Sequence, residues 1–267
     1  MKYKVICSDL DGTLLTTKSD VSQETISTFQ KLKKTRRIIL VSARMPNGMF
    51  YLQRALHIFG EPIVCYNGAL ILDGQSKKFS VTVPINIVQE IHKISEALKT
   101  DLGLYYNNEW YVPKDSERVR KETKYTKTKP VFKATNETLS NWKERKVGAH
   151  KIMLMGTQES ADRLMPILSE KFSGQINLYR SNDTLIEIAP KTVSKLSAIK
   201  LLLKEKETLQ DVIAFGDNYN DIEMLQHCGL GVAVGNAREE VKAIADEITL
   251  KNTDNGVAHF LNNHLEF

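Results

Sequence analysis

Two carboxylates, Asp9 and Asp11, follow the first strand-like run of the sequence, in the segment D-L-D-G-T. In an extended chain these two side chains can point the same way, and Gly12 allows the backbone to leave the strand sharply. Two carboxylates held together repel each other unless a cation or a shared proton compensates. A hard cation such as Mg²⁺, which takes oxygen ligands and can share them with a phosphate group, suits such a pair. The pair therefore predicts a cation site rather than a simple polar turn.

A second acidic segment, G-D-N-Y-N-D at residues 216–221, follows another apolar run near the other end of the chain. Asp217 ends that run, and Asp221 falls near the start of the next predicted helix, where the helix dipole favours an anion. Alone, this segment could form an Asx turn that caps a helix. Together with Asp9 and Asp11 it predicts a set of four carboxylates.

The elements around these segments predict an α/β fold. Short apolar runs separated by amphipathic helical patterns are typical of a parallel sheet that is buried on both faces. Such runs lie at residues 4–8, 38–42, 62–66, 212–215 and 231–234. Open sheets of this kind place their ligands at the carboxyl ends of the strands, and both acidic segments follow a strand at that end.

The rhythm of the pattern changes in the middle of the chain. Hairpin signals such as Asn107-Asn108 alternate there with helical patterns, and a polar helix near residues 115–124 is followed by a less regular stretch to Gly148. After Pro190 the α/β rhythm returns. We therefore predict a Rossmann-like, doubly wound parallel sheet core of residues 1–83 and 190–267, interrupted by an inserted α+β cap domain of residues 84–189.

The composition indicates an ordinary globular protein, with 42% hydrophobic and 26% charged residues. No run approaches the roughly 20 apolar residues that span a bilayer, and the first residues do not read as a secretory signal. We expect a cytoplasmic protein without a membrane partner. The three cysteines, Cys7, Cys65 and Cys228, have no CxxC spacing and are interpreted as small buried hydrophobes, not as a disulfide framework or zinc site.

The net charge of +5 is unevenly distributed. Residues 114–151 contain twelve Lys or Arg against five Asp or Glu. A solvated, Lys-rich surface is one interpretation of this basic segment, and a surface for an anionic small molecule is another. No nucleic-acid-binding motif accompanies the charge, so we expect no nucleic-acid partner.

These features resemble the haloacid dehalogenase superfamily, and specifically its Cof-type phosphatases, which carry a large inserted α/β cap. The resemblance covers essentially the whole chain. It rests on D-L-D-G-T-L at 9–14, V-S-A-R at 41–44, Y-N-G-A at 66–69, the lysine at 195, and G-D-N-Y-N-D at 216–221.

The resemblance implies a mechanism and a metal. The first Asp of the motif is the nucleophile of the family and the second is the general acid/base, and these positions are occupied by Asp9 and Asp11. The family's Mg²⁺ would be held by Asp9, the backbone carbonyl of Asp11, and Asp217, with Asp221 helping from further out or through water.

The resemblance also implies a phosphate- and substrate-binding set. It consists of the backbone amide of Leu10, the segment Ser42, Ala43 and Arg44, and the side chains of Lys195 and Asn220. Lys195 lies early in a predicted helix, so its ammonium and the helix N-terminus could both favour a phosphate. Arg44 could reach the substrate or could be an exposed surface arginine.

The chain departs from the family pattern in two places. Ser42-Ala43 stands where relatives usually have Thr-Gly, and the hydroxyl is retained. Around the lysine, Thr192 and Leu196 replace glycines that relatives often carry, which keeps the charge of Lys195 but changes the expected backbone path.

We therefore expect a phosphatase that hydrolyses a small phosphorylated metabolite. A sugar phosphate is the substrate class that the resemblance favours. A sugar phosphomutase and a non-catalytic phosphometabolite-binding protein are the alternatives. Four aromatic residues of the cap could line the substrate pocket or fill the hairpin core: Tyr105, Tyr106, Trp110 and Tyr111.

Overall fold

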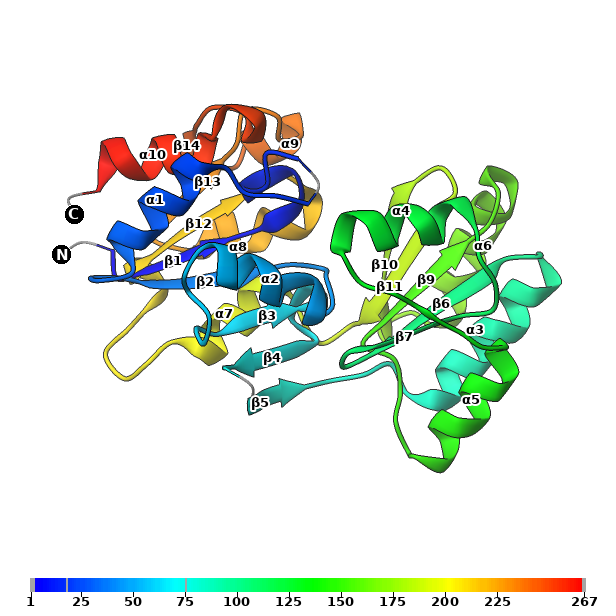
Figure 1. Cartoon of the computed structure of the whole chain (residues 1–267). Coiled ribbons are helices and arrows are strands. Elements are labelled where there is room, and N and C mark those ends of the chain that lie inside the picture. The colour runs from blue at the N-terminus through cyan, green and yellow to red at the C-terminus, as the bar shows by residue number, and fades with distance from the viewer. Residues whose placement is uncertain (1–2, 18, 75, 266–267) are drawn as a thin grey trace. The chain divides into compact units, whose positions relative to one another are not determined.

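The computed structural model describes residues 3–17, 19–74 and 76–265, and the chain divides into two compact units. Met1–Phe79 and Ser194–Phe267 form the first unit, and Ser80–Val193 form the second. These junctions lie four residues outside the predicted limits of the insertion, 84 and 189, at either end. The first unit is blue to cyan and yellow to red in Figure 1, and the second is mainly green. None of the helices among the described residues is long and apolar enough to cross a membrane.

The first unit is built on an eight-stranded sheet in the order β14-β13-β12-β1-β2-β3-β4-β5. Its strands are β1 (Val5–Ser8), β2 (Arg37–Val41), β3 (Ile63–Cys65), β4 (Leu70–Asp73), β5 (Ser76–Ser80), β12 (Val212–Gly216), β13 (Leu230–Ala233) and β14 (Glu247–Ile248). The strands from β14 to β3 pair in parallel, and β4 is antiparallel to β3. The predicted parallel sheet is therefore confirmed.

Helices cover this sheet, and the central strands β1 and β12 are consequently buried along their whole length. The helices of the unit are α1 (Gln23–Leu32), α2 (Asn47–Ala55), α7 (Lys195–Leu202), α8 (Ile222–His227), α9 (Glu239–Lys242) and α10 (Gly256–His264). α1 packs against α10, and α7 packs against α8. The α1 helix begins at Ser22, whose hydroxyl accepts a hydrogen bond from the backbone N–H of Thr25 and so satisfies one free donor of the first turn.

The second unit contains a six-stranded, mostly antiparallel sheet in the order β10-β11-β9-β6-β7-β8. Its strands are β6 (Asp101–Tyr106), β7 (Glu109–Val112), β8 (Val131–Phe132), β9 (Lys151–Met155), β10 (Ile176–Asn182) and β11 (Leu185–Pro190). Its helices are α3 (Ile85–Ala97), α4 (Glu117–Thr126), α5 (Thr135–Glu144) and α6 (Gln158–Lys171). Alternate residues of the strands, such as Leu102 and Leu104 of β6, enter the same apolar core as α3 and α6. This is the α+β organisation expected for the insertion.

The prediction of a less regular stretch before Gly148 is wrong, because β8 and the ten-residue helix α5 lie within it. The sequence of α5, T-N-E-T-L-S-N-W-K-E, has few strong helix formers and only two large apolar residues. Leu139 and Trp142 are both buried, and α5 packs against α3. Tertiary packing thus stabilises a helix that the local sequence signals only weakly.

The hairpin aromatics belong mainly to the core of the second unit. Tyr105 and Trp110 are each 1% exposed, and their rings stack with centroids 5.4 Å apart. Tyr106 and Tyr111 each place a ring edge-on to Trp142, at 6.0 and 6.1 Å. The alternative in which these residues fill the hairpin core is therefore confirmed for the buried pair. The cysteines are likewise free and buried, as expected.

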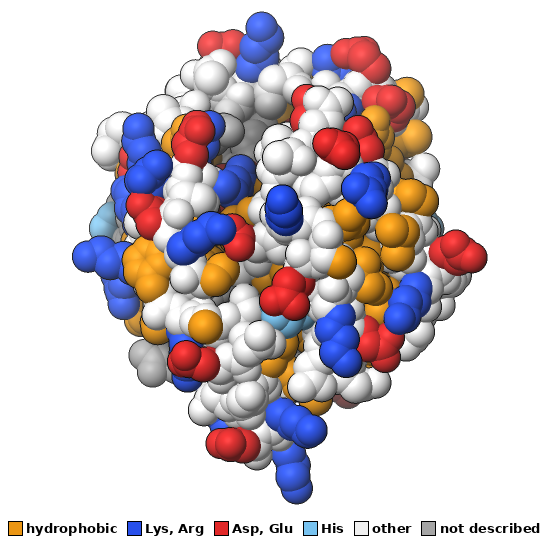
Figure 2. Space-filling model, turned by 90° about the vertical axis from the view of Figure 1, so that its right-hand side faces the viewer, with side chains coloured by type: hydrophobic (Ala, Val, Ile, Leu, Met, Phe, Trp, Pro, Cys, Tyr) orange, Lys and Arg blue, Asp and Glu red, His pale blue; other side chains and the backbone are white. Residues whose placement is uncertain are grey.

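The basic segment 114–151 pairs many of its charges locally. Arg118 contacts Glu122, Lys121 contacts Glu117, and other basic side chains of the segment form ion pairs with Asp101, Asp115 and Glu109. Figure 2, which looks onto the side of the second unit, shows basic and acidic side chains interspersed over that face. This arrangement favours the solvated-surface interpretation over a binding surface for an anion.

Candidate active site

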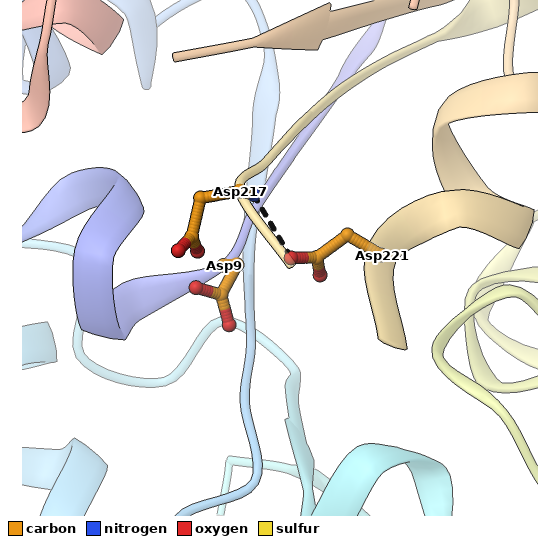
Figure 3. A group of neighbouring side chains, drawn as sticks. All are labelled: Asp9, Asp217 and Asp221. Atoms are coloured by element: carbon orange, nitrogen blue, oxygen red, sulfur yellow. Dashed lines mark hydrogen bonds between the residues drawn. The ribbon is translucent and has the colours of Figure 1, made fainter. Parts of the chain in front are cut away.

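The two acidic segments leave the first sheet at the same edge. Strands β1 and β12 are parallel neighbours with Ser8 opposite Phe215, so Asp9 and Asp217 both follow a carboxyl end. The backbone N–H of Asp9 donates to the carbonyl of Phe215 over 3.0 Å, which extends the pairing to the site itself. Carboxylate oxygens of Asp9, Asp217 and Asp221 lie within 4.8 Å of one another, and their side chains converge in Figure 3.

Asp221 is fixed by the turn between β12 and α8. One of its carboxylate oxygens accepts the backbone N–H groups of Asp217 and Asn218, each over 3.0 Å. The side chain is fully buried. A Cβ on Gly216 would lie 2.4 Å from the Cβ of Asp221, so this turn closes only over a glycine. The G-D-x-x-N-D spacing therefore serves to hold one carboxylate rigidly beside another.

Asp217 is held by the loop Leu10–Leu14 (η1), which follows β1. The Thr13 hydroxyl donates to a carboxylate oxygen of Asp217 over 2.8 Å. Gly12 has φ +88°, and a Cβ there would lie 2.6 Å from the other oxygen of Asp217. The carbonyl of Gly12 in turn accepts from the side chain of Asn236 over 2.8 Å. Sequence reasoning assigned no role to Thr13 or Asn236; Thr13 stood in the motif, whereas Asn236 lay outside every motif.

Lys195 lies between two of the carboxylates. Its Nζ is 2.6 Å from an oxygen of Asp9 and 2.6 Å from an oxygen of Asp221, and the side chain is 1% exposed. It is the first residue of α7, whose start is fixed by a capping box between Ser194 and Ser197. Leu196, which replaces a family glycine, is buried and does not displace the lysine from the site.

The charges of this group do not balance. Burial raises the pKa of Asp9 well above its usual value; Lys195 offsets this only in part, and the carboxylates of Asp221 and Asp217 raise it further. Burial and the Asp221 charge likewise raise the pKa of Asp217 to about 6. For Lys195, burial acts to lower the pKa, but Asp221 and Asp9 outweigh it and the pKa is raised.

The pKa values of Asp9 and Lys195 are both raised, which favours the charged form of Lys195 but disfavours that of Asp9, and the excess of carboxylates explains this difference. One ammonium is fully stabilised by its neighbours, while three carboxylates share that single cation. Clustered carboxylate oxygens with an excess of negative charge are the ligand chemistry of a hard divalent cation. The residues present therefore fit the divalent metal that the family resemblance implies.

The predicted phosphate donors Ser42 and Asn220 meet at one turn. Asn67 connects them: its N–H donates to the carbonyl of Ser42 over 2.9 Å, and its side-chain oxygen accepts from the side chain of Asn220 over 3.0 Å. Asn67 has a left-handed backbone with φ +56°. Gly68 follows with φ +108°, and a Cβ there would lie 2.4 Å from the carbonyl oxygen of Ser194. The Y-N-G motif thus joins β2, the turn Tyr219–Asp221 (η4) and the start of α7.

The motif at 66–69 supports the family resemblance, but the sequence alone predicts no role for Asn67. The available signal was the Asn-Gly pair itself, since both residues readily take left-handed conformations. Leu10 is fully buried, and Ala43 lies between two buried neighbours, Ser42 and Arg44. The backbone groups of Leu10 and Ala43 stay predicted ligands.

The carboxylate of Asp11 lies apart from the other three. Arg44 donates from Nε and Nη2 to its two oxygens, over 2.7 and 2.6 Å. The structure therefore brings together three of the four predicted carboxylates and pairs the fourth with an arginine. The interpretation of Arg44 as an exposed surface residue is wrong, because its side chain is 3% exposed, while that of Asp11 is 44% exposed.

Comparison with known proteins identifies the family of the chain. The family described as haloacid dehalogenase-like hydrolase matches residues 6–261. A haloacid dehalogenase-like hydrolase of Bacteroides thetaiotaomicron has a crystal structure that superimposes with a TM-score of 0.89, at 30% identity over 99% of this chain and 100% of that one. The 5-amino-6-(5-phospho-D-ribitylamino)uracil phosphatase of Bacillus subtilis is 28% identical over 97% of both chains.

A third relative, the pyridoxal phosphate phosphatase of Escherichia coli, is 24% identical over 99% of this chain and 100% of its own. The matches extend over both units and are not confined to the sheet that carries the site. This chain therefore belongs to the haloacid dehalogenase superfamily, as a hydrolase of its Cof-type phosphatases.

Proposed function

We propose that the protein hydrolyses a small phosphomonoester in a Mg²⁺-dependent reaction that passes through an aspartyl-phosphate on Asp9. The observation that carries this proposal is the environment of the Asp9 carboxylate. It is 5% exposed, 2.6 Å from the ammonium of Lys195, and grouped with Asp217 and Asp221. A carboxylate in such a negative environment can attack a phosphate only where cations offset the repulsion between the two anions.

The reaction has two balanced halves. In the first, a carboxylate oxygen of Asp9 forms a bond to phosphorus, the bond from phosphorus to the leaving oxygen breaks, and the carboxyl proton of Asp11 passes to that oxygen. In the second, water attacks the phosphorus of the aspartyl-phosphate and gives a proton to Asp11. Inorganic phosphate leaves, and the carboxylate of Asp9 is restored.

The surrounding residues divide between the cation and the phosphate. Asp9, Asp217 and the backbone carbonyl of Asp11, assisted by Asp221, would hold Mg²⁺. The cation, when bound, supplies positive charge that offsets both the carboxylates and the phosphate. Lys195, Ser42, Asn220 and the amide of Leu10 would bind phosphate oxygens and orient the phosphorus toward Asp9.

The substrate that we propose is a sugar or polyol phosphate. The Bacillus subtilis relative is named for a substrate with a phospho-D-ribityl group, which supports this class. The Escherichia coli relative is named for pyridoxal phosphate, so the fold accepts more than one kind of leaving group among its relatives. We propose that the inserted domain, residues 84–189, selects among such compounds.

Phosphate release from a panel of sugar, polyol and cofactor phosphomonoesters tests the proposal, with Mg²⁺ or with EDTA, for the wild type and Asp9→Asn. We expect release that requires Mg²⁺ and is lost in the variant. Appreciable release by a folded Asp9→Asn protein would exclude Asp9 as the nucleophile. Conversion of a sugar 1-phosphate into its isomer without free phosphate would identify a mutase instead.

A further inference from the structure

We propose that Arg44 is a positioning residue for Asp11 and does not bind the substrate phosphate. This inference rests on the proposed function, because it concerns the residue that exchanges the proton in that reaction. It replaces the role that the family resemblance implied for Arg44.

Arg44 is fixed from several sides. Its Nη1 donates to the carbonyl of Gly48 over 3.2 Å and to the hydroxyl oxygen of Tyr51 over 3.0 Å. Tyr51 in turn donates its hydroxyl proton to the carbonyl of Ser19 over 2.7 Å. The backbone N–H of Arg44 donates to the hydroxyl oxygen of Ser42 over 3.2 Å. With 3% of its side chain exposed, the guanidinium is therefore a rigid part of the loop after β2.

Asp11 needs such a support. Its side chain is 44% exposed and lies on the loop that follows β1, so an unsupported carboxylate would rotate freely in water. The planar fork of an arginine matches a carboxylate with two parallel hydrogen bonds, which fixes the orientation as well as the position. Both oxygens of Asp11 are bound in this way.

The same contacts argue against phosphate binding by Arg44. Four hydrogen bonds from its guanidinium go to protein acceptors, two of them to Asp11. A guanidinium has five N–H donors, so a phosphate could be bound bidentately only by displacing Asp11. Lys195, in contrast, contacts Asp9 and Asp221, two of the three grouped carboxylates. We infer that Arg44 acts on the reaction through Asp11.

The leaving group provides the test. A poor leaving group, such as an alkyl oxygen, needs the proton of Asp11 as it departs, whereas p-nitrophenolate departs without it. The value of kcat/KM reports the steps up to this departure and excludes the later hydrolysis of the aspartyl-phosphate. We would measure kcat/KM for a series of aryl and alkyl phosphates of increasing leaving-group pKa, with the wild type and Arg44→Lys.

We expect Arg44→Lys to lower kcat/KM by about 30-fold for an alkyl phosphate and by less than about 3-fold for p-nitrophenyl phosphate, since a well-placed general acid contributes about 10²–10⁴-fold. The decrease of kcat/KM with rising leaving-group pKa should therefore be steeper in Arg44→Lys than in the wild type. Asp11→Asn sets the limiting slope, and Tyr51→Phe should move the slope slightly in the same direction. Arg37→Lys is the matched control: Arg37 is also largely buried and ion-paired, with Glu207, but lies at the start of β2.

An equal loss for all leaving groups would overturn the proposal, because it would mean that Arg44 acts on the transferred phosphoryl group or only on the fold. An unchanged rate for every compound would show that the pair with Asp11 is not used. Failure of the proposed function looks different: there the wild type releases no phosphate, or Asp9→Asn keeps its activity.

Discussion

In the part of the chain that the structure describes, each unit buries a lysine between carboxylates, and the two groups differ in their balance of charge. Lys195 of the first unit lies between Asp9 and Asp221 and is 1% exposed. Lys151 of the second unit is 5% exposed, with its Nζ 3.2 Å from Glu187 and 3.8 Å from Glu122. At the level of a single ion pair the two look alike.

Around Lys151 the charges are matched. Arg118 pairs with Glu122 over 3.1 Å, and the hydroxyl of Ser181 donates to Glu187 over 2.7 Å. Burial acts to raise the pKa of Glu187, but Lys151 and these donors outweigh it and the pKa is lowered. In the first unit the pKa values of Asp9 and Asp217 are raised instead. Removing one charge from a balanced buried group destabilises a fold, whereas an excess of buried charge with raised pKa values marks a candidate ligand site.

Replacing each lysine should give the largest difference between the two groups, because one substitution affects turnover and the other affects stability. We expect Lys195→Met to lower turnover by about 10³-fold, because it removes a preorganised cation from the reaction centre. Lys151→Met should instead lower the free energy of unfolding by about 3–5 kcal/mol, since it leaves buried carboxylates unpaired. Urea unfolding and turnover per folded molecule measure both effects. A raised KM in Lys151→Met would contradict a purely structural role for Lys151. It would place Glu187 and its neighbours in the substrate pocket.

Mg²⁺ should stabilise the folded protein by binding to the group with excess negative charge, which contains Asp9, Asp217 and Asp221, and not through the group around Lys151. At about 100 times its dissociation constant, Mg²⁺ should raise the free energy of unfolding by about 2.7 kcal/mol. The increase should disappear in Asp217→Asn and persist in Glu187→Gln, which serves as the matched control. Denaturant unfolding with Mg²⁺ and with EDTA gives this difference. An equal gain in all three proteins would mean that the cation binds elsewhere.

In the metal-free protein, the two groups should contribute to the free energy of unfolding with opposite dependence on pH. The pKa of Asp217 is raised to about 6, so its ionisation destabilises the fold and stability is regained as the pH falls through that value. The pKa of Glu187 is lowered, so its contribution is lost at acid pH. We expect Asp217→Asn to remove about 2 kcal/mol of the gain between pH 7 and pH 4.5. A pH profile unchanged by this substitution would contradict the raised pKa.

The smallest effect is expected from adding a methyl group beside the carboxylate of Asp217. Gly12→Ala would place a Cβ 2.6 Å from its carboxylate, whereas Gly60→Ala, also at positive φ, meets nothing within 4 Å. Both variants should lose about 1–2 kcal/mol from the left-handed backbone. Only Gly12→Ala should also lower turnover, by about 10-fold, because a displaced catalytic group loses its alignment. Equal activities of the two variants would show that the position of Asp217 tolerates this shift.

The sequence predicts the parts of the site that follow from chain direction. Parallel strands end at one edge, so Asp9 and Asp217 had to meet once β1 and β12 were neighbours. The pairing of Asp11 with Arg44 could not be predicted in this way. It depends on the rotamers of two side chains from different loops, and the hydroxyl of Tyr51, which accepts a hydrogen bond from Arg44, helps to set one of them.

Other features escape sequence reasoning for different reasons. Asn236 contacts the site through the carbonyl of Gly12, and a single asparagine in a loop carries no local pattern. Helix α5 depends on burying Leu139 and Trp142 against another helix, so its stability is not visible in its own residues. Local periodicity predicts elements that are stable by themselves and misses those that need a partner.

The pairing of β1 with β12 also determines when the site can form. Residues 5–8 are made early in synthesis, but their partner strand begins at Val212, after the whole of the second unit. The second unit is continuous in sequence and can fold as soon as it leaves the ribosome. Closing the first unit requires a contact across some two hundred residues, so it should be the slow step of folding. Until then Asp9 and Asp217 are held by separate parts of an open chain, so the group of three carboxylates forms only after residue 217 has been made and the two strands have paired.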